Sequence, residues 1–127
     1  MDGVVHFEVP LENIERGTEF YKKVFEWGVE KAGEMPYWMA RTSECDEKQM
    51  PKELGKINGG FYEKGDGEAS NNPVIVIKVK DMDESIKKIQ ENGGSITLEK
   101  NQVGDMGLYA QFKDTENNIM GLWQDLK

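Results

Sequence analysis

One pattern is written twice along this chain, and the repeat limits the folds that the chain can adopt. A strand-like segment over residues 4–9 precedes a helical stretch, and a second such segment over residues 74–79 precedes another. Each helical stretch is followed by further short segments with strand character. A strand, a helix and several strands, repeated, indicate two modules of one topology. We expect a pocket where the two sheets of such a pair face each other.

The first predicted strand has two different faces. Val5, Phe7 and Val9 alternate with His6 and Glu8, so the two polar side chains share one face. We therefore expect His6 and Glu8 to point into the pocket and the three apolar side chains to pack under the helices.

The rest of the first module reads as a helix and three strands. Pro10 should end the first strand, because proline suits a central strand poorly. The spacing of apolar residues predicts a helix over 13–26, with Asn13 as its cap and Gly28 as its stop. Strands are expected over 29–32, 36–42 and 57–62. The charged segment 43–56 is either a lid over the pocket or a solvated insertion.

A polar, turn-rich segment separates the two modules. Residues 65–73 form the predicted linker, so we place the first module at 1–64 and the second at 74–127, within one domain. Residues 74–79 are apolar enough for a strand buried on both faces. Asp81 and Glu84 have the spacing of a capping box, and the helix that they begin should end at Gly93. Strands are expected over 95–98, 107–112 and 119–123.

Charge and cysteine content argue against several classes of function. The 127 residues carry a formal net charge of -8, which disfavours binding to nucleic acid or to an anionic membrane. No apolar run approaches the length of a membrane span. The single Cys45 cannot form an internal disulfide, so a reducing cytoplasm is the expected compartment. The first residues also lack the character of a secretory signal.

Several motifs, taken together, resemble the vicinal oxygen chelate superfamily of glyoxalases, extradiol dioxygenases and bleomycin-resistance proteins. They are His6 on the first strand, Phe20-Tyr21 and Trp27-Gly28 around the first helix, Asn92-Gly93-Gly94 after the second helix, and the turn and strand at 114–123. The resemblance covers essentially the whole chain. It implies an α+β fold in which two βαβββ modules form a cupped mixed β-sheet with the helices outside. It also implies a homodimer.

The resemblance implies a divalent metal with ligands from four strands, but this sequence keeps one ligand position. His6 matches the first ligand. The second position falls within residues 57–61, which hold no carboxylate, the third falls on Val74 and the fourth on Gly121. An isolated imidazole does not hold a divalent ion tightly. We therefore predict no metal and no cofactor, and the alternative is a weakly bound divalent metal.

These observations predict a glyoxalase/bleomycin-resistance-like protein that binds a small organic ligand in an apolar, metal-free cup. In the last strand, Ile119 and Trp123 should face the cup with Gly121, and Met120 and Leu122 should face the helices. The candidate ligand-binding residues are His6, Trp38, Gly59, Phe61, Val74, Tyr109, Gly121 and Trp123.

Two other hypotheses come from different classes. One is a metal-dependent lyase or isomerase of the glyoxalase type, in which His6 and Glu8 are the candidate catalytic residues and water or a partner subunit completes the site. The other is a scaffold whose aromatic side chains fill the cup completely. The sequence leaves open whether the chain is an enzyme.

Overall fold

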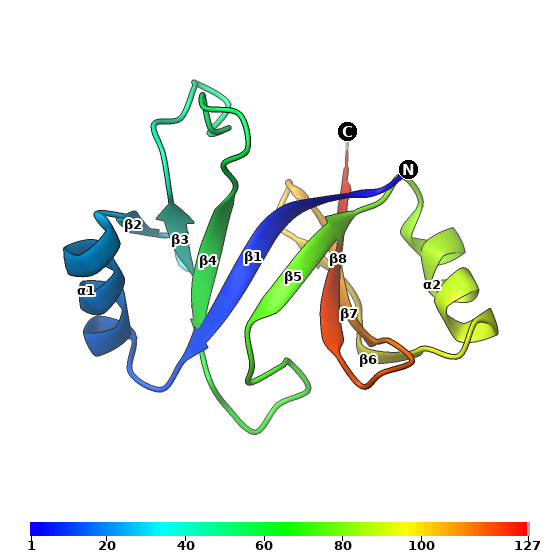
Figure 1. The fold of residues 1–127 in the computed structure, drawn as a ribbon. Helices are drawn as coiled ribbons and strands as arrows, with labels where there is room; N and C mark the ends of the chain where they lie inside the picture. Colours follow the sequence, from blue (N-terminus) through cyan, green and yellow to red (C-terminus); the bar gives the residue numbers. More distant parts are fainter. Residues whose placement is uncertain (127) are drawn as a thin grey trace. The chain divides into compact units, whose positions relative to one another are not determined.

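The predicted repeat is confirmed by the order of helices and strands. The computed structural model describes residues 1–126, and Lys127, the last residue of the predicted second module, lies outside the described residues. The first module contains β1 (Gly3–Leu11), α1 (Ile14–Phe25), β2 (Gly28–Lys31), β3 (Trp38–Arg41) and β4 (Asn58–Glu63). The second contains β5 (Val74–Lys78), α2 (Met82–Glu91), β6 (Ser95–Val103), β7 (Gly107–Lys113) and β8 (Ile119–Asp125) (Figure 1).

Each module has four strands in a mixed arrangement, and the two modules share one pairing scheme. In the first module the strand order is β2-β3-β4-β1, and in the second it is β6-β7-β8-β5. The first strand of each module pairs in parallel with the last strand, so β1 pairs with β4 and β5 pairs with β8. The other pairs in each module are antiparallel. The fold class is therefore the predicted one, two βαβββ modules of the α+β class.

The compact units differ slightly from the predicted modules. One unit is residues 6–65, and the other combines residues 1–5 with the chain from Asp66 onward. The first residues of β1 thus belong with the second unit. The segment 65–73, which we predicted to be a linker, is also partly packed into that unit, because Ser70 is buried and its backbone N–H donates to Gln111.

Both helices begin at the predicted caps. The Asn13 side chain accepts a hydrogen bond from the Arg16 backbone N–H at 2.8 Å, and the Asp81 side chain accepts one from Glu84 at 3.1 Å. The stop of α1 differs from the prediction, because Glu26 takes the left-handed conformation with φ 61° and Gly28 already begins β2. Within residues 1–126, neither helix has the length and apolar character needed to cross a membrane.

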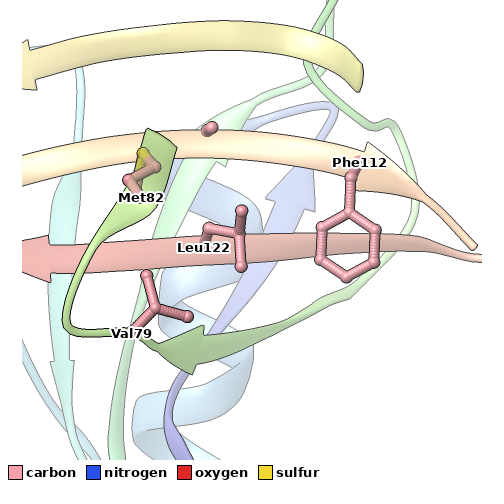
Figure 2. Packing of buried hydrophobic residues seen from close by; sticks show 5 residues of the cluster. Val79, Met82, Phe112 and Leu122 are labelled. Carbon is pink, nitrogen blue, oxygen red and sulfur yellow. The ribbon is translucent and has the colours of Figure 1, made fainter. Parts of the chain in front are cut away.

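The core of the second module lies between α2 and one face of its sheet. Its buried apolar side chains are Val79, Met82, Ala110, Phe112 and Leu122 (Figure 2). Ile86 and Ile89 of α2 pack against them, as does Met120 of β8. The expectation that Met120 and Leu122 face the helix layer is therefore confirmed.

The core of the first module is aromatic. α1 packs on β4 and β2. Tyr21 of α1 stacks on Trp27 with ring centroids 5.0 Å apart and lies 5.3 Å from Phe61 of β4, which is fully buried. Phe7 of β1 contacts Trp27 at 5.4 Å, so Phe7 lies on the helix side of the sheet as predicted.

Two expectations about strands are wrong. β1 continues through Pro10 to Leu11, and the Leu11 carbonyl accepts from the Lys64 backbone N–H at 2.9 Å. Because backbone groups alternate in direction along a strand, the proline nitrogen points away from β4, so the pairing of β1 with β4 loses no hydrogen bond.

β5 is not buried on both faces, since Val74 and Val76 are buried but Ile75 between them is 48% exposed.

Candidate functional site

His6 lies on the sheet face of the first module that is opposite α1. Its imidazole Nε2 forms a hydrogen bond of 2.7 Å with the hydroxyl of Tyr37, a residue just before β3. The Tyr37 ring lies over Gly60 of β4, because a Cβ atom on Gly60 would lie 2.0 Å from the Tyr37 hydroxyl oxygen. His6, Tyr37 and Gly60 therefore form one cluster, which we call the His6 cluster.

Burial changes the protonation of His6. It lowers the pKa of the imidazole from 6.5 to about 4, because the charged form loses its water. His6 is therefore neutral at pH 7. A neutral imidazole can act as a base or as a metal ligand, but here its Nε2 is already hydrogen-bonded to Tyr37.

Glu8 lies on the same face of β1 as His6, two residues further along the strand, and its side chain is buried. Its partner on β4 is Gly60, the glycine under the Tyr37 ring. The prediction that His6 and Glu8 share the face opposite the helix therefore agrees with the structure. Their role as a catalytic pair stays a prediction.

Three residues that we expected in the cup lie on the helix side instead. Phe61 packs against Tyr21 of α1, and Trp38 is its direct partner on β3 and so shares its face. A Cβ atom on Gly59 would lie 2.4 Å from the Phe7 ring, so that ring fills the space beside the glycine. The prediction assigned these residues to the wrong face of their strands. Alternate residues face opposite sides, and Tyr37 rather than its neighbour Trp38 faces His6.

In the second module, the sheet face opposite α2 is mostly apolar around Gly121. A Cβ atom on Gly121 would lie 3.0 Å from Val76 Cγ2, 3.3 Å from Val74 Cγ1 and 3.3 Å from the Tyr109 hydroxyl oxygen. Trp123 is the strand partner of Tyr109 and shares its face, as predicted. We call this set the Gly121 face; its residues are Val74, Val76, Tyr109, Gly121 and Trp123.

A buried amide on this face was missed by the sequence analysis. Gln111 of β7 is the partner of Gly121 and is 1% exposed. Its Oε1 accepts from the Ser70 backbone N–H at 2.8 Å, and its Nε2 donates to the Tyr109 hydroxyl at 2.7 Å. A glutamine between Ala110 and Phe112 in an apolar strand was a signal for it, because a polar side chain buried there needs partners.

A charged pair lies at the end of the same face. Lys78 and Asp125 form an ion pair, and the Trp123 indole N–H donates to Asp125 at 2.7 Å. The Lys78 ammonium group is the main reason why the pKa of Asp125 is lowered. A cavity of about 390 Å³ adjoins this pair and is also lined by Lys80 and Gln124.

The residues present do not fit the divalent metal that the resemblance implies. Val74 is a buried apolar side chain, and valines and a tyrosine crowd the position of Gly121. Among residues 57–61, the Tyr37 ring occupies the space that a side chain at Gly60 would need. Within residues 1–126, no three His, Cys, Asp or Glu side chains are grouped closely enough to hold a metal ion. His6 and Glu8 alone make an incomplete donor set.

Comparisons with known proteins agree with this fold. The sequence profile described as the Glyoxalase/Bleomycin resistance protein/Dioxygenase superfamily matches residues 3–121. No curated protein matches the sequence significantly.

Solved structures resemble the chain over almost its whole length. Methylmalonyl-CoA epimerase from Mycobacterium tuberculosis is 12% identical, with a TM-score of 0.62 over 98% of this chain and 89% of that one. The Streptomyces coelicolor methylmalonyl-CoA epimerase, solved as a variant with 2-nitronate-propionyl-CoA, is 16% identical, with a TM-score of 0.63 over 98% and 97%.

A superfamily member from Vibrio splendidus 12B01 is 14% identical, with a TM-score of 0.60 over 98% of this chain and 100% of that one. At such identities the structures indicate a shared fold and not a shared activity. The sequence profile covers most of the chain, and the repeated modules match it. The chain therefore belongs to the glyoxalase/bleomycin resistance protein/dioxygenase superfamily.

Proposed function

We propose that this protein binds a small, flat organic ligand on the Gly121 face without a metal ion. The observation that carries the proposal is the environment of Gly121. Related enzymes are expected to place a metal-binding carboxylate there, whereas here a glycine lies among Val74, Val76 and Tyr109. Sites for small organic molecules are lined mostly by apolar and aromatic side chains with a few polar groups.

The chemistry of the face suits an aromatic or otherwise planar ligand. Val74 and Val76 are apolar and buried, and the partly exposed rings of Tyr109 and Trp123 lie beside each other on neighbouring strands. Ring stacking contributes roughly 0.5–1.5 kcal/mol for each pair beyond the burial of apolar area.

The experiment is a screen of planar hydrophobic compounds by thermal shift and tryptophan fluorescence. Gly121→Val adds bulk at the centre of the face and should weaken binding at least tenfold, since its Cβ atom alone would lie 3.0–3.3 Å from three neighbours. Gly67→Val is the matched control, because a Cβ atom at Gly67 meets nothing within 4 Å. If compounds bind both variants and the wild type equally, the ligand does not lie on this face.

We also propose that the protein forms a homodimer and acts in the cytoplasm, as the family resemblance and the lone Cys45 lead us to expect. An apolar patch on α1 supports self-association, because Phe20, Val24 and Phe25 are each more than half exposed. Sedimentation equilibrium at micromolar concentration should give twice the monomer mass. A monomer at all concentrations would contradict the dimer and leave the ligand site unaffected.

A further inference from the structure

A cavity beside the ion pair of Lys78 and Asp125 is not part of the proposed Gly121 site. Its volume is about 390 Å³, which falls within the range of roughly 300–1,000 Å³ that is usual for sites of small molecules. Its lining comes from the first residues of the chain, the end of β5 and the end of β8. All of these residues belong to one compact unit, and none belongs to the Gly121 face. A ligand in this cavity would therefore be independent of a ligand on that face.

Four charged side chains line this cavity, and two of them already neutralise each other. Lys78 and Asp125 form an ion pair, and the Trp123 indole N–H donates to the other carboxylate oxygen of Asp125 at 2.7 Å. The remaining two, Lys80 and Asp2, are exposed and have opposite charges. Within residues 1–126, neither side chain has a hydrogen bond or an ion pair, so the two do not pair with each other. The described part of the chain therefore gives this cavity one unpaired cation and one unpaired anion.

The backbone on both sides of Lys80 is fixed to β8. The Val79 N–H donates to the Trp123 carbonyl at 2.8 Å, and the Met82 N–H donates to the side-chain oxygen of Gln124 at 2.6 Å. Because the Gln124 oxygen faces a donor, its amide still offers the two hydrogens of its nitrogen. Gln124 lines the cavity, so it can supply a neutral donor in addition to the Lys80 ammonium group. A negatively charged group that accepts hydrogen bonds fits this part of the lining.

The rest of the lining includes apolar side chains. Val79 is 5% exposed and belongs to the core of the second module, whereas Val5 of β1 is 36% exposed. A ligand that covers these two side chains with an apolar group removes apolar surface from water, which favours binding. The lining therefore suits a small molecule that has charges of both signs and a short aliphatic part.

We propose that this cavity binds a free α-amino acid with an aliphatic side chain. The carboxylate of the ligand pairs with Lys80 and accepts from the Gln124 amide, and its ammonium group pairs with Asp2. Its side chain packs against Val5 and Val79. An anion without an amine would meet Asp2 as a like charge, and a cation without a carboxylate would meet Lys80 as one. A zwitterion is the ligand whose charges match both unpaired groups.

The test compares L-leucine with two analogues that each lack one charged group. 4-Methylpentanoate lacks the ammonium group and 3-methylbutylamine lacks the carboxylate, and both keep the aliphatic chain. Each is titrated into the full chain at neutral pH up to millimolar concentrations, and the backbone amide signals are followed by NMR. Because an exposed ion pair contributes little, we expect leucine to bind roughly 2- to 5-fold more tightly than either analogue. The amide signals of residues 78–80 and 124 should move most, because these residues line the cavity.

Two substitutions should remove the two preferences separately. Lys80→Met keeps a long side chain without its charge, so the preference for leucine over 3-methylbutylamine should fall toward one. Asp2→Asn should instead remove the preference for leucine over 4-methylpentanoate. Both residues are exposed, so neither substitution should unfold the protein. Lys87→Met and Asp66→Asn are the matched controls, because these residues are exposed and lie outside the cavity lining, and both variants should keep the wild-type preferences.

Each outcome supports or overturns the proposal. Separate loss of the two preferences, with moving signals at residues 78–80, supports it. If leucine binds no more tightly than either analogue, the cavity does not recognise a zwitterion and the proposal is wrong. It is also wrong if the moving signals lie elsewhere, if leucine moves none, or if the control variants change the preferences as much as Lys80→Met and Asp2→Asn do. None of these results bears on the Gly121 face, whose own test uses planar compounds and Gly121→Val.

Discussion

Acid should destabilise this protein through its only histidine. His6 is partly buried in the His6 cluster, and its pKa is lowered from 6.5 to about 4 by the loss of hydration. Because the folded pKa lies below the unfolded one, the unfolded state binds more protons between these values. The stability contributed by neutral His6 is therefore complete above pH 6.5 and is lost as the pH falls toward 4.

The size of this effect follows from the same two pKa values. Each pH unit between 6.5 and about 4 corresponds to about 1.4 kcal/mol, so the full loss is at most about 3 kcal/mol. At pH 5, about 2 kcal/mol of it should already be lost. That is a large fraction of the 5–15 kcal/mol that is typical of a whole domain.

The assay is chemical denaturation of the wild type and of His6→Gln at pH 7 and pH 5. Glutamine keeps a polar group near Tyr37 but does not titrate. The acidic residues are the same in both proteins, so their contribution to the pH dependence of stability cancels in the comparison. We expect the wild type to lose about 2 kcal/mol more than the variant. Proton NMR gives the pKa directly, because the sequence contains one histidine. A measured pKa near 6.5, or equal losses in both proteins, would refute the reasoning.

Three further predictions address the His6 cluster, the helix cap and the metal. Gly60→Ala should displace the Tyr37 ring, lower the free energy of unfolding by about 1–3 kcal/mol and raise the pKa of His6, as measured by denaturation and NMR. Gly28→Ala is the control, because its Cβ atom would lie 3.7 Å from Arg41, and it should change neither the stability nor the pKa of His6. Asn13→Ala should cost about 1 kcal/mol, measured by urea denaturation, because the Arg16 N–H loses its acceptor; an unchanged midpoint would contradict the cap. Elemental analysis of the purified protein should find no stoichiometric divalent metal, and one equivalent that is lost in His6→Ala would contradict our reading of Val74 and Gly121.

Much of the fold could be predicted from neighbouring residues. The caps Asn13 and Asp81 accept hydrogen bonds from residues three positions later, so the signal and its structure lie within one helical turn. Alternation along β1 and β8 likewise identified the two faces of each strand. His6 and Glu8 lie opposite the helix, and Met120 and Leu122 lie under α2, as alternation predicts.

The candidate site depended on pairings that no short window contains. Tyr37 rather than Trp38 faces His6, because the register of β3 against β4 pairs Trp38 with buried Phe61. The predicted strand over 36–42 contains both Tyr37 and Trp38, and a shift of one residue in its register exchanges the face on which each of them lies. The sequence analysis therefore placed Trp38 in the cup, where the structure has Tyr37 beside His6.

The sequence by itself determined two βαβββ modules and their helix caps, because each of these depends on residue types and short spacings. The resemblance to the superfamily, and not the spacing, implied that Val74 and Gly121 stand at metal-ligand positions. Only the tertiary structure decided that Gln111 joins Ser70 to Tyr109 and that the Tyr37 ring occupies the space beside Gly60. Ser70 and Gln111 lie 41 residues apart in the chain. Their contact depends on how β7 and β8 are paired and where the preceding segment packs, and the free energy of such packing belongs to the whole module rather than to any one segment.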